Sequence, residues 1–330
     1  LDNTELMSLL VRYGALVDET NQRGQSALML AAQAGNAKAV SHLLVLGADT
    51  TIRNQDGKTA LDLAEAHEQQ AEVKLLRGMV DADQSTKRLV QAPGQDLEEL
   101  IGMAKDGSVI QLAAGVSKSS IYLVDKTVTL LGAPQGGTVL TGGTKQFVVI
   151  VGKNANLYAR DLTIAPTGAA EYGIYVVGGH AVIVDSTITK SPKAGLVISE
   201  GNVTVRRCDF ENCKQGISTT GKGSLHVYSS RFVGCPEAGI SARGVDTVHV
   251  VANQFHGSKL GVTCQELKER LVLRYNTFVS STEMASSSMG LFVENGRRAV
   301  VTDNQWWGFE QGVHISGALD RPLLFHRNLI

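Results

Sequence analysis

Two lines of sequence, VTVRRCDF (203–210) and LHVYSSRF (225–232), decide the fold of most of this chain. They carry the same pattern, which returns after 22 residues. In each line apolar and polar residues alternate, and the line ends in a phenylalanine, Phe210 or Phe232. Such alternation predicts a short β-strand with one buried face. A pattern that returns at a fixed period predicts a repeat architecture in which each copy covers its neighbour.

Further copies of this line fill the rest of the chain from residue 155 onward. They are NLYARDLTI (156–164), AVIVDSTI (181–188), VHVVANQF (248–255), LVLRYNTF (271–278), AVVTDNQW (299–306) and LLFHRNLI (323–330). A series of glycines runs at nearly the same period, and each glycine precedes an aliphatic residue. The series is Gly173, Gly195, Gly216, Gly239, Gly261, Gly290 and Gly312. Three short strands per coil at this period predict a right-handed parallel β-helix, in which equal positions on successive coils lie about 4.8 Å apart.

Equal positions on successive coils are expected to form ladders of like side chains. One such position is Ser186, Cys208, Ser230, Asn253, Asn276, Asn304 and Asn328. We expect its amides to hydrogen-bond along the stack and these residues to tolerate a left-handed backbone. The glycine series is assigned to turns that need a positive φ. Cys213 and Cys235 share another position, which favours buried thiols over the alternative of a disulfide.

The start of this region has a pattern of its own. Residues 96–115 (DLEELIGMAKDGSVIQLAAG) read as an amphipathic helix, a turn at Asp106–Gly107 and a first strand, and VDKTVTLLG (124–132) reads as the next strand. Together with the repeats, residues 96–330 resemble the parallel β-helix of the pectin-lyase-like superfamily, with the helix as its N-terminal cap. That superfamily contains lyases, hydrolases, esterases and non-catalytic binders, so the resemblance implies a fold rather than an activity.

A different period, of 33 residues, occupies the first quarter of the chain. GQSALMLAAQAGNAKAVSHLLVLGA (24–48) is followed by GKTALDLA (57–64), and both resemble ankyrin repeats. Ser26 and Thr59 are expected to cap the first helix of each repeat. Residues 5–16 read as the second helix of an earlier repeat, so about two and a half repeats are present. We expect the array to continue upstream or to dock onto the neighbouring C-terminal domain.

The predicted organisation is therefore a two-domain solenoid. α-Helical ankyrin repeats span 1–78, a connector spans 79–95, and an all-β right-handed parallel β-helix with an N-terminal cap helix spans 96–330. Two interpretations of the ankyrin part stay open: a protein-binding surface on its hairpin tips and first helices, or a cap that only packs against the neighbouring domain. The chain opens with Leu1 rather than Met, so the native N-terminus is expected upstream, and the location we expect is cytoplasmic.

Composition excludes several classes of protein. Lys plus Arg is 31 and Asp plus Glu is 32, so the net charge is -1 and no basic surplus exists to neutralise nucleic-acid phosphates. No apolar run approaches the roughly 18 residues that a membrane-spanning helix needs. The four cysteines show no CxxC pair of the kind that binds zinc. We therefore expect no nucleic acid, no membrane, no metal and no cofactor.

Candidate site residues come from the outward positions of the predicted strands. Glu294 and His314 lie on adjacent coils and are the candidate catalytic residues. The candidate binding residues are Arg206, His226, Tyr228, His249, Arg274 and Trp307, because Arg, Tyr and Trp are favoured in contact patches. A longer coil at 280–289 (SSTEMASSSM) is a further candidate binding loop.

These residues favour a non-catalytic protein that binds another protein through its ankyrin and β-helix surfaces. Paired carboxylates and the sequence motifs of pectin-degrading enzymes are missing from the outward positions. The alternative is a carbohydrate-active enzyme, a polysaccharide lyase or a glycoside hydrolase, with a polysaccharide as its partner. A second alternative is a bacterial toxin or a toxin-neutralising protein.

Overall fold

The computed structural model describes residues 6–7, 17–45, 48–73, 76, 88–92, 95–133, 137–280, 288–317 and 323–330. It consists of two compact units, Leu1–Arg88 and Leu89–Ile330. Each unit has its own hydrophobic core. In the part of the chain that the structure describes, no helix is both long enough and apolar enough to cross a membrane.

The first unit contains paired helices of the kind that its 33-residue period predicts. They are α2 (Ala27–Gln33), α3 (Ala37–Val45) and α4 (Ala60–Ala66). Ser26 caps α2 by accepting a hydrogen bond from the Met29 amide, and Thr59 caps α4 in a reciprocal capping box with Asp62. Both predicted caps are therefore confirmed. Most of the helix predicted within 5–16 lies outside the described residues.

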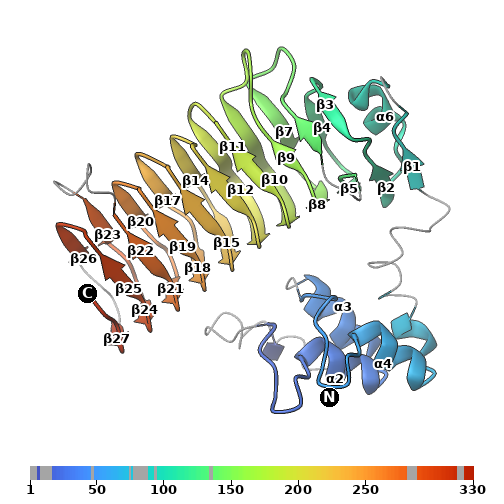
Figure 1. Ribbon diagram of the computed structural model, residues 1–330, viewed down its shortest axis with the longest axis horizontal. Coiled ribbons are helices and arrows are strands. Elements are labelled where there is room, and N and C mark those ends of the chain that lie inside the picture. The colour runs from blue at the N-terminus through green and yellow to red at the C-terminus, as the bar shows by residue number, and fades with distance from the viewer. Residues whose placement is uncertain are drawn as a thin grey trace. The chain divides into compact units, whose positions relative to one another are not determined.

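The second unit is a parallel β-helix with three faces (Figure 1). Face A contains β4 (Ile121–Leu123), β7 (Phe147–Val151), the first halves of β10 (Tyr172–Val184) and β12 (Ala194–Arg206), β14 (Gln215–Thr219), β17 (Ala238–Arg243), β20 (Leu260–Gln265), β23 (Met289–Glu294) and β26 (Gln311–Ser316). Face B contains β1 (Arg88–Val90), β2 (Ser108–Gln111), β5 (Thr127–Leu131), β8 (Asn156–Arg160), the second halves of β10 and β12, β15 (Gly223–Tyr228), β18 (Thr247–Val251), β21 (Arg270–Arg274), β24 (Ala299–Thr302) and β27 (Leu324–His326). Face C contains β3 (Gly115–Ser117), β6 (Thr138–Leu140), β9 (Thr163–Ile164), β11 (Thr187–Thr189), β13 (Asp209–Glu211), β16 (Arg231–Val233), β19 (Gln254–His256), β22 (Thr277–Val279) and β25 (Gln305–Trp307).

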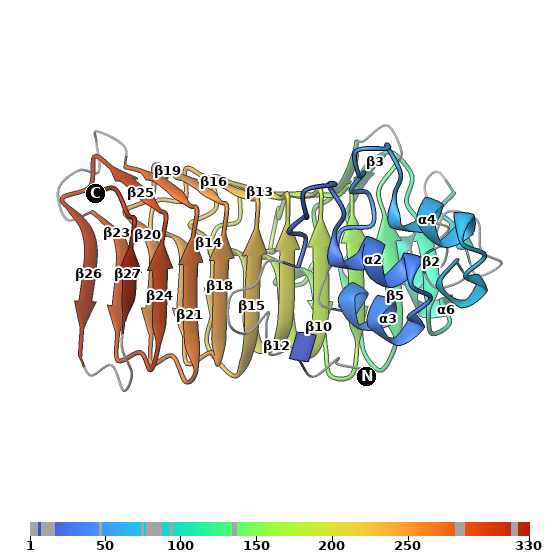
Figure 2. The same cartoon turned by 90° about the horizontal axis from the view of Figure 1, so that it is seen from below.

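From β2 onward the strands pair in parallel with their equivalents on the neighbouring coils, and Figure 2 shows the face B strands β15, β18, β21 and β24 side by side. Faces A and B are hydrogen-bonded as one sheet, because β10 and β12 each run along both of them. Strand β1 lies inside the stretch predicted as a connector and pairs with β2. The predicted cap is α6 (Leu97–Met103), which buries Leu97, Leu100 and Ile101 in the first coils of the core.

A column of aromatic rings runs through the core along face C. Neighbouring rings in the column are near-parallel, with centroids 4.6–5.4 Å apart, which is close to the spacing of the strands that carry them. The column consists of Phe210, Phe232, Phe255, Phe278 and Trp306. Trp306 is 3% exposed, so the tryptophan that ends the line AVVTDNQW (299–306) is buried like the phenylalanines that end the other lines.

Glycine recurs in the series of seven from Gly173 to Gly312 for a different reason from the predicted one. None of its seven members is among the residues with positive φ, so the assignment to left-handed turns is wrong. A Cβ on Gly239 would lie 2.5 Å from Cδ1 of Phe255, and a Cβ on Gly216 would lie 2.6 Å from Cδ1 of Phe232. Glycine is required because each ring lies directly against the backbone of a face A strand.

The predicted asparagine ladder is present on the last four coils. The side-chain oxygen of Asn276 accepts from the backbone amide of Asn253 at 2.9 Å and from its Nδ2 at 3.0 Å. Asn304 accepts the same pair of bonds from Asn276, at 3.0 and 2.9 Å. The asparagines of the ladder do not have the left-handed backbone that was predicted for them. The residue before each of them has it instead, such as Tyr275 (φ 57°) before Asn276.

Removing one amide from this ladder should destabilise the β-helix. In an Asn276→Ala variant the Asn253 amide and the Val250 carbonyl lose buried partners, so we expect the free energy of unfolding to fall by about 3 kcal/mol. Urea unfolding of the full chain measures this change. Asn202→Ala, at an exposed amide, is the matched control and should change stability by less than about 0.5 kcal/mol. Equal midpoints for the two variants would contradict a stabilising ladder.

The four cysteines are buried free thiols, so the disulfide alternative for Cys213 and Cys235 is wrong. Their burial disfavours the charged thiolate. Burial raises the pKa of Cys208, Cys235 and Cys264 to about 12 and also raises the pKa of Cys213.

The thiols should therefore be unreactive in the folded protein. At pH 8 we expect a chromogenic disulfide reagent to modify none of them in native buffer and all four in concentrated urea. Absorbance of the released thiolate measures the count. Rapid modification of even one cysteine in native buffer would contradict the burial of these side chains.

Candidate binding surfaces

Four of the predicted binding residues lie together on face B. The register places His226 beside His249 and Arg206 beside Tyr228 on neighbouring strands. The two imidazole rings are 4.8 Å apart between centroids and nearly parallel. The guanidinium of Arg206 lies 5.1 Å from the centroid of the Tyr228 ring. Arg274 is in the same row as Tyr228 but two strands further along, where its Nε donates to Thr302.

One ring of the histidine pair is buried and the other, that of His226, is half-buried. His249 is 2% exposed. Burial, together with the charge of Arg206, lowers the pKa of His226 from 6.5 to about 4. His226 is therefore neutral at physiological pH. Among the described residues, no group of three or more His, Cys, Asp and Glu side chains could hold a metal ion.

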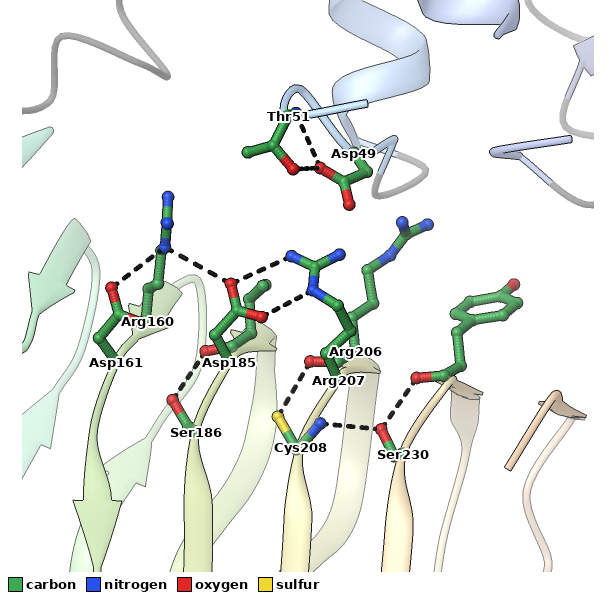
Figure 3. A network of polar contacts seen from close by, with 12 residues as sticks. Asp49, Thr51, Arg160, Asp161, Asp185, Ser186, Arg206, Arg207, Cys208 and Ser230 are labelled. Carbon is green, nitrogen blue, oxygen red and sulfur yellow. Dashed lines mark hydrogen bonds and ion pairs between the residues drawn. The ribbon is translucent and has the colours of Figure 1, made fainter. Parts of the chain in front are cut away.

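The corner where face B ends carries alternating charges (Figure 3). Asp185 accepts two hydrogen bonds from Arg207, at 2.6 and 3.1 Å, and lies 3.6 Å from Nε of Arg160. Arg160 also contacts Asp161 at 3.2 Å. In this ladder each carboxylate neutralises the guanidinium groups beside it. The guanidinium of Arg207 is thus bound to a carboxylate of its own sheet, and that of its neighbour Arg206 lies over the ring of Tyr228.

The two candidate catalytic residues lie on face A in different rows. Glu294 pairs in register with Ser316, and His314 pairs with Phe292. Gln265 donates a 2.7 Å hydrogen bond to the carboxylate of Glu294, whereas the ring of His314 stacks on Phe292 with centroids 5.4 Å apart. Glu294 and His314 therefore interact with different neighbours and do not form an acid–base pair with each other.

Trp307 lies on the outer side of face C. Its side chain is 49% exposed and stands beside Val279 of the preceding coil. The predicted outward direction of this residue is confirmed. Most of the candidate loop 280–289 lies outside the described residues.

A cluster of rings on the first coils of face A, in which Tyr122 is exposed and the others are half-buried, was not predicted. Phe147 stacks on Tyr172 at 5.3 Å and meets Tyr175 edge-on at 4.6 Å. Beside them, Tyr122, Ile150 and Tyr175 form one outward row. We call this cluster the aromatic patch; it consists of Tyr122, Phe147, Ile150, Tyr172, Tyr175 and Val177. The irregular lengths of the coils before residue 155 hid it, and the signal that could have found it is the match of FVVIV (147–151) to YGIYV (172–176).

The ankyrin-like unit presents two hairpin loops that are built alike. Asn21 Oδ1 accepts from the backbone amides of Arg23 and Gln25, and Asn54 Oδ1 accepts from those of Asp56 and Lys58, at 2.9–3.0 Å. The loops are also joined to each other, because the Gln55 amide donates to the carbonyl of Arg23 at 3.1 Å. In the same unit Thr51 donates two hydrogen bonds to Asp49 (Figure 3). These bonds fix the loop backbones and leave the tip side chains exposed.

Two protein-family models match this chain, one in each of its two units. Residues 1–88 match the family model described as ankyrin repeats in three copies, and residues 148–306 match the model of the right-handed β-helix region. The first unit therefore consists of ankyrin repeats, and the second contains a right-handed β-helix. The resemblance of the second unit to the pectin-lyase-like superfamily stays a prediction.

Individual relatives match over the length of about two ankyrin repeats. An ankyrin repeat protein of Acanthamoeba polyphaga mimivirus is 38% identical over 63 residues, which is 19% of this chain and 9% of the relative. An ankyrin repeat-containing protein of Treponema pallidum is 41% identical over 73 residues, 22% of this chain and 24% of the relative. The human NAD-capped RNA hydrolase NUDT12 is 40% identical over 63 residues, 19% of this chain and 14% of the relative. The chain thus spans less than a quarter of each relative.

The low pKa of His226 should make the fold sensitive to acid. The unfolded chain takes up a proton near pH 6.5, whereas the folded chain resists it down to about pH 4. This contribution to stability is therefore complete above pH 6.5 and is lost as the pH falls toward 4. Unfolding free energies measured in urea between pH 7 and pH 4 should fall less steeply for His226→Gln than for the unsubstituted chain. His180→Gln, at an exposed position, is the control; identical slopes for all three proteins would contradict the assignment.

Proposed function

We propose that this chain is a non-catalytic protein-binding protein, in which the hairpin tips and first helices of the ankyrin unit recognise a partner protein and the β-helix is a rigid support with contact surfaces of its own. Ankyrin repeats are in general protein-interaction modules. The observation that carries the proposal is the pair of braced loops at Asn21 and Asn54. A loop that is already held in one conformation loses less entropy when it binds.

The two loops share a framework and differ at their tips. Asn and Gly recur 33 residues apart, as in Gly24 and Gly57, where φ is 72° and 74°. Of the two exposed residues between them, Gln22 recurs as Gln55, whereas Arg23 is replaced by Asp56. A constant backbone with variable, exposed side chains is the arrangement expected of a recognition surface. Leu30, 44% exposed on α2, adds an apolar contact on the first helix.

The β-helix supports the same function with residue types that are common at contact hot spots. Trp307 on face C, which is 49% exposed, is the residue that we propose for it, whereas Arg206 on face B is only 5% exposed and is not offered as a contact. Catalysis is not the function that we propose for face A, because Glu294 is held by Gln265 and His314 stacks on a different neighbour.

Reversing charge at the ankyrin tips tests the proposal. Full-length protein carrying Arg23→Asp and Lys58→Glu should recover its partner from a cell extract at least tenfold less than the unsubstituted chain, because the reversed charges no longer match the partner surface that the native tips recognise. Quantitative mass spectrometry of the captured proteins measures the ratio. The matched control is Lys268→Glu, an exposed charge on a β-helix turn, which should recover the partner normally.

Two outcomes would contradict the proposal. One is the same set of captured proteins, in equal amounts, from the tip variant and the unsubstituted chain. The other is the release of new reducing ends or unsaturated products from a polysaccharide by the purified chain, with loss of that activity in Glu294→Gln.

A further inference from the structure

We propose that the aromatic patch on face A is a self-association surface, on which a second copy of this chain packs its own patch. It is separate from the ankyrin surface of the proposed function. The patch covers the first coils of face A, where β4, β7 and β10 pair in register. Tyr122 is 60% exposed and Val177 is 41% exposed, so apolar surface is open to water at both margins of the patch.

The fold does not need apolar side chains at these positions. The outward row that contains Tyr122, Ile150 and Tyr175 continues on later coils through Val197, Ser218, Ser241, Thr263 and Phe292. The row that contains Phe147 and Tyr172 continues through Ala194, Gln215, Ala238, Leu260 and Met289. Several later coils thus carry small or polar residues in these rows, so strand pairing does not require the rings. Single exposed apolar residues are ordinary on protein surfaces, but here two exposed and four half-buried side chains, aromatic or aliphatic, gather on neighbouring strands, which is typical of an interface.

The shape of the patch suits another sheet. Phe147 and Tyr172 stack on each other across neighbouring strands, with an angle of 21° between their planes, and Tyr175 meets Phe147 edge-on. The side chains of the patch thus form rows at the spacing of the β-strands. Rows at this spacing fit rows of the same kind on a second sheet, as in sheet-on-sheet packing.

The charges around the patch suit a second copy better than a strongly charged partner. At the start of the strands Glu171 binds Lys193 at 2.8 Å and accepts from Gln146 at 2.6 Å, while Lys193 lies over the ring of Tyr172. At the end of the strands Lys153 is exposed and Glu200 pairs in register with Val177. Each border thus carries both signs, so a second copy can place opposite charges against it in either orientation. A purely acidic or purely basic partner would meet like charges at both borders.

The patch is small, and this sets the strength of the contact. Face-to-face packing of a few strands lies at the low end of specific interfaces, so we expect a reversible dimer rather than a permanent one. Sedimentation velocity of the full chain from about 1 to about 100 μM should show a concentration-dependent shift from monomer to dimer.

Substitutions on face A test whether the patch is responsible. Tyr122→Ser combined with Tyr175→Ser places at these positions the residue type that Ser218 and Ser241 already have in the same row. We expect this variant to weaken association about tenfold or more, because it removes one exposed and one half-buried aromatic side chain from the patch. Phe292→Ser, in the same row but on a later coil, is the matched control and should associate as the unsubstituted chain does. Circular dichroism and urea midpoints verify that all variants are folded.

A label identifies the face directly. Because the four native cysteines are buried, Tyr122→Cys supplies a single reactive thiol for a spin label. Pulsed dipolar spectroscopy should then report a short distance between labels on two copies, whereas a label at Trp307→Cys on face C should report a longer one.

Three results would overturn the proposal: a monomer at every concentration, a serine double variant that associates like the unsubstituted chain, or labels at Tyr122→Cys that stay far apart in a dimer. The double variant should still capture the ankyrin partner. If it does not, the patch binds that partner instead of a second copy. Failure of the ankyrin tip experiment leaves this test unaffected, because it measures association of the purified chain alone.

Discussion

The contact between a flat ring and a backbone without a Cβ is the constraint on which the β-helix depends. Phe255 lies so close to Gly239 that no other residue fits there, and the same pairing recurs from coil to coil. The ring fixes the distance between face C and face A, and the strand spacing fixes the distance between rings. On the coils from Phe210 to Trp306 the cross-section of the β-helix is therefore set by one aromatic residue and one glycine per coil, and the aliphatic residues fill the space that remains.

The period of the sequence was enough to predict the fold, since a β-helix repeats the same contacts and those contacts select the same residue types. The paired histidines could be predicted for the same reason, because His226 and His249 occupy equal positions in lines 23 residues apart. The cause of the glycine series could not, since a crowded Cβ and a positive φ select the same residue. The position of the left-handed residue was missed too, because Asp185, Arg207 and Tyr275 share no chemistry that would mark it.

The aromatic patch was missed for a related reason. Tyr122, Ile150 and Tyr175 are separated by 28 and 25 residues, whereas later coils repeat after about 22 or 23. Longer loops between these strands conceal a register that the backbone hydrogen bonds keep. The charged pairs at the borders, such as Glu171 with Lys193, also join residues of neighbouring coils and depend on that register. The residues that lie together on the surface of a β-helix can be identified only when the coils are aligned by strand pairing rather than by the number of residues per coil.

The regular pairing of face A also fixes the distances between features along that face. Tyr175 and Phe292 lie in one row, separated by five strand steps, or about 24 Å at the usual strand spacing. Any two features of a face are separated by a whole number of such steps. A binding partner that touches two of them must match that distance, and the gain or loss of one coil would change it by a single step without altering either feature. Spacing is thus a property that this fold can vary independently of the chemistry on its surface.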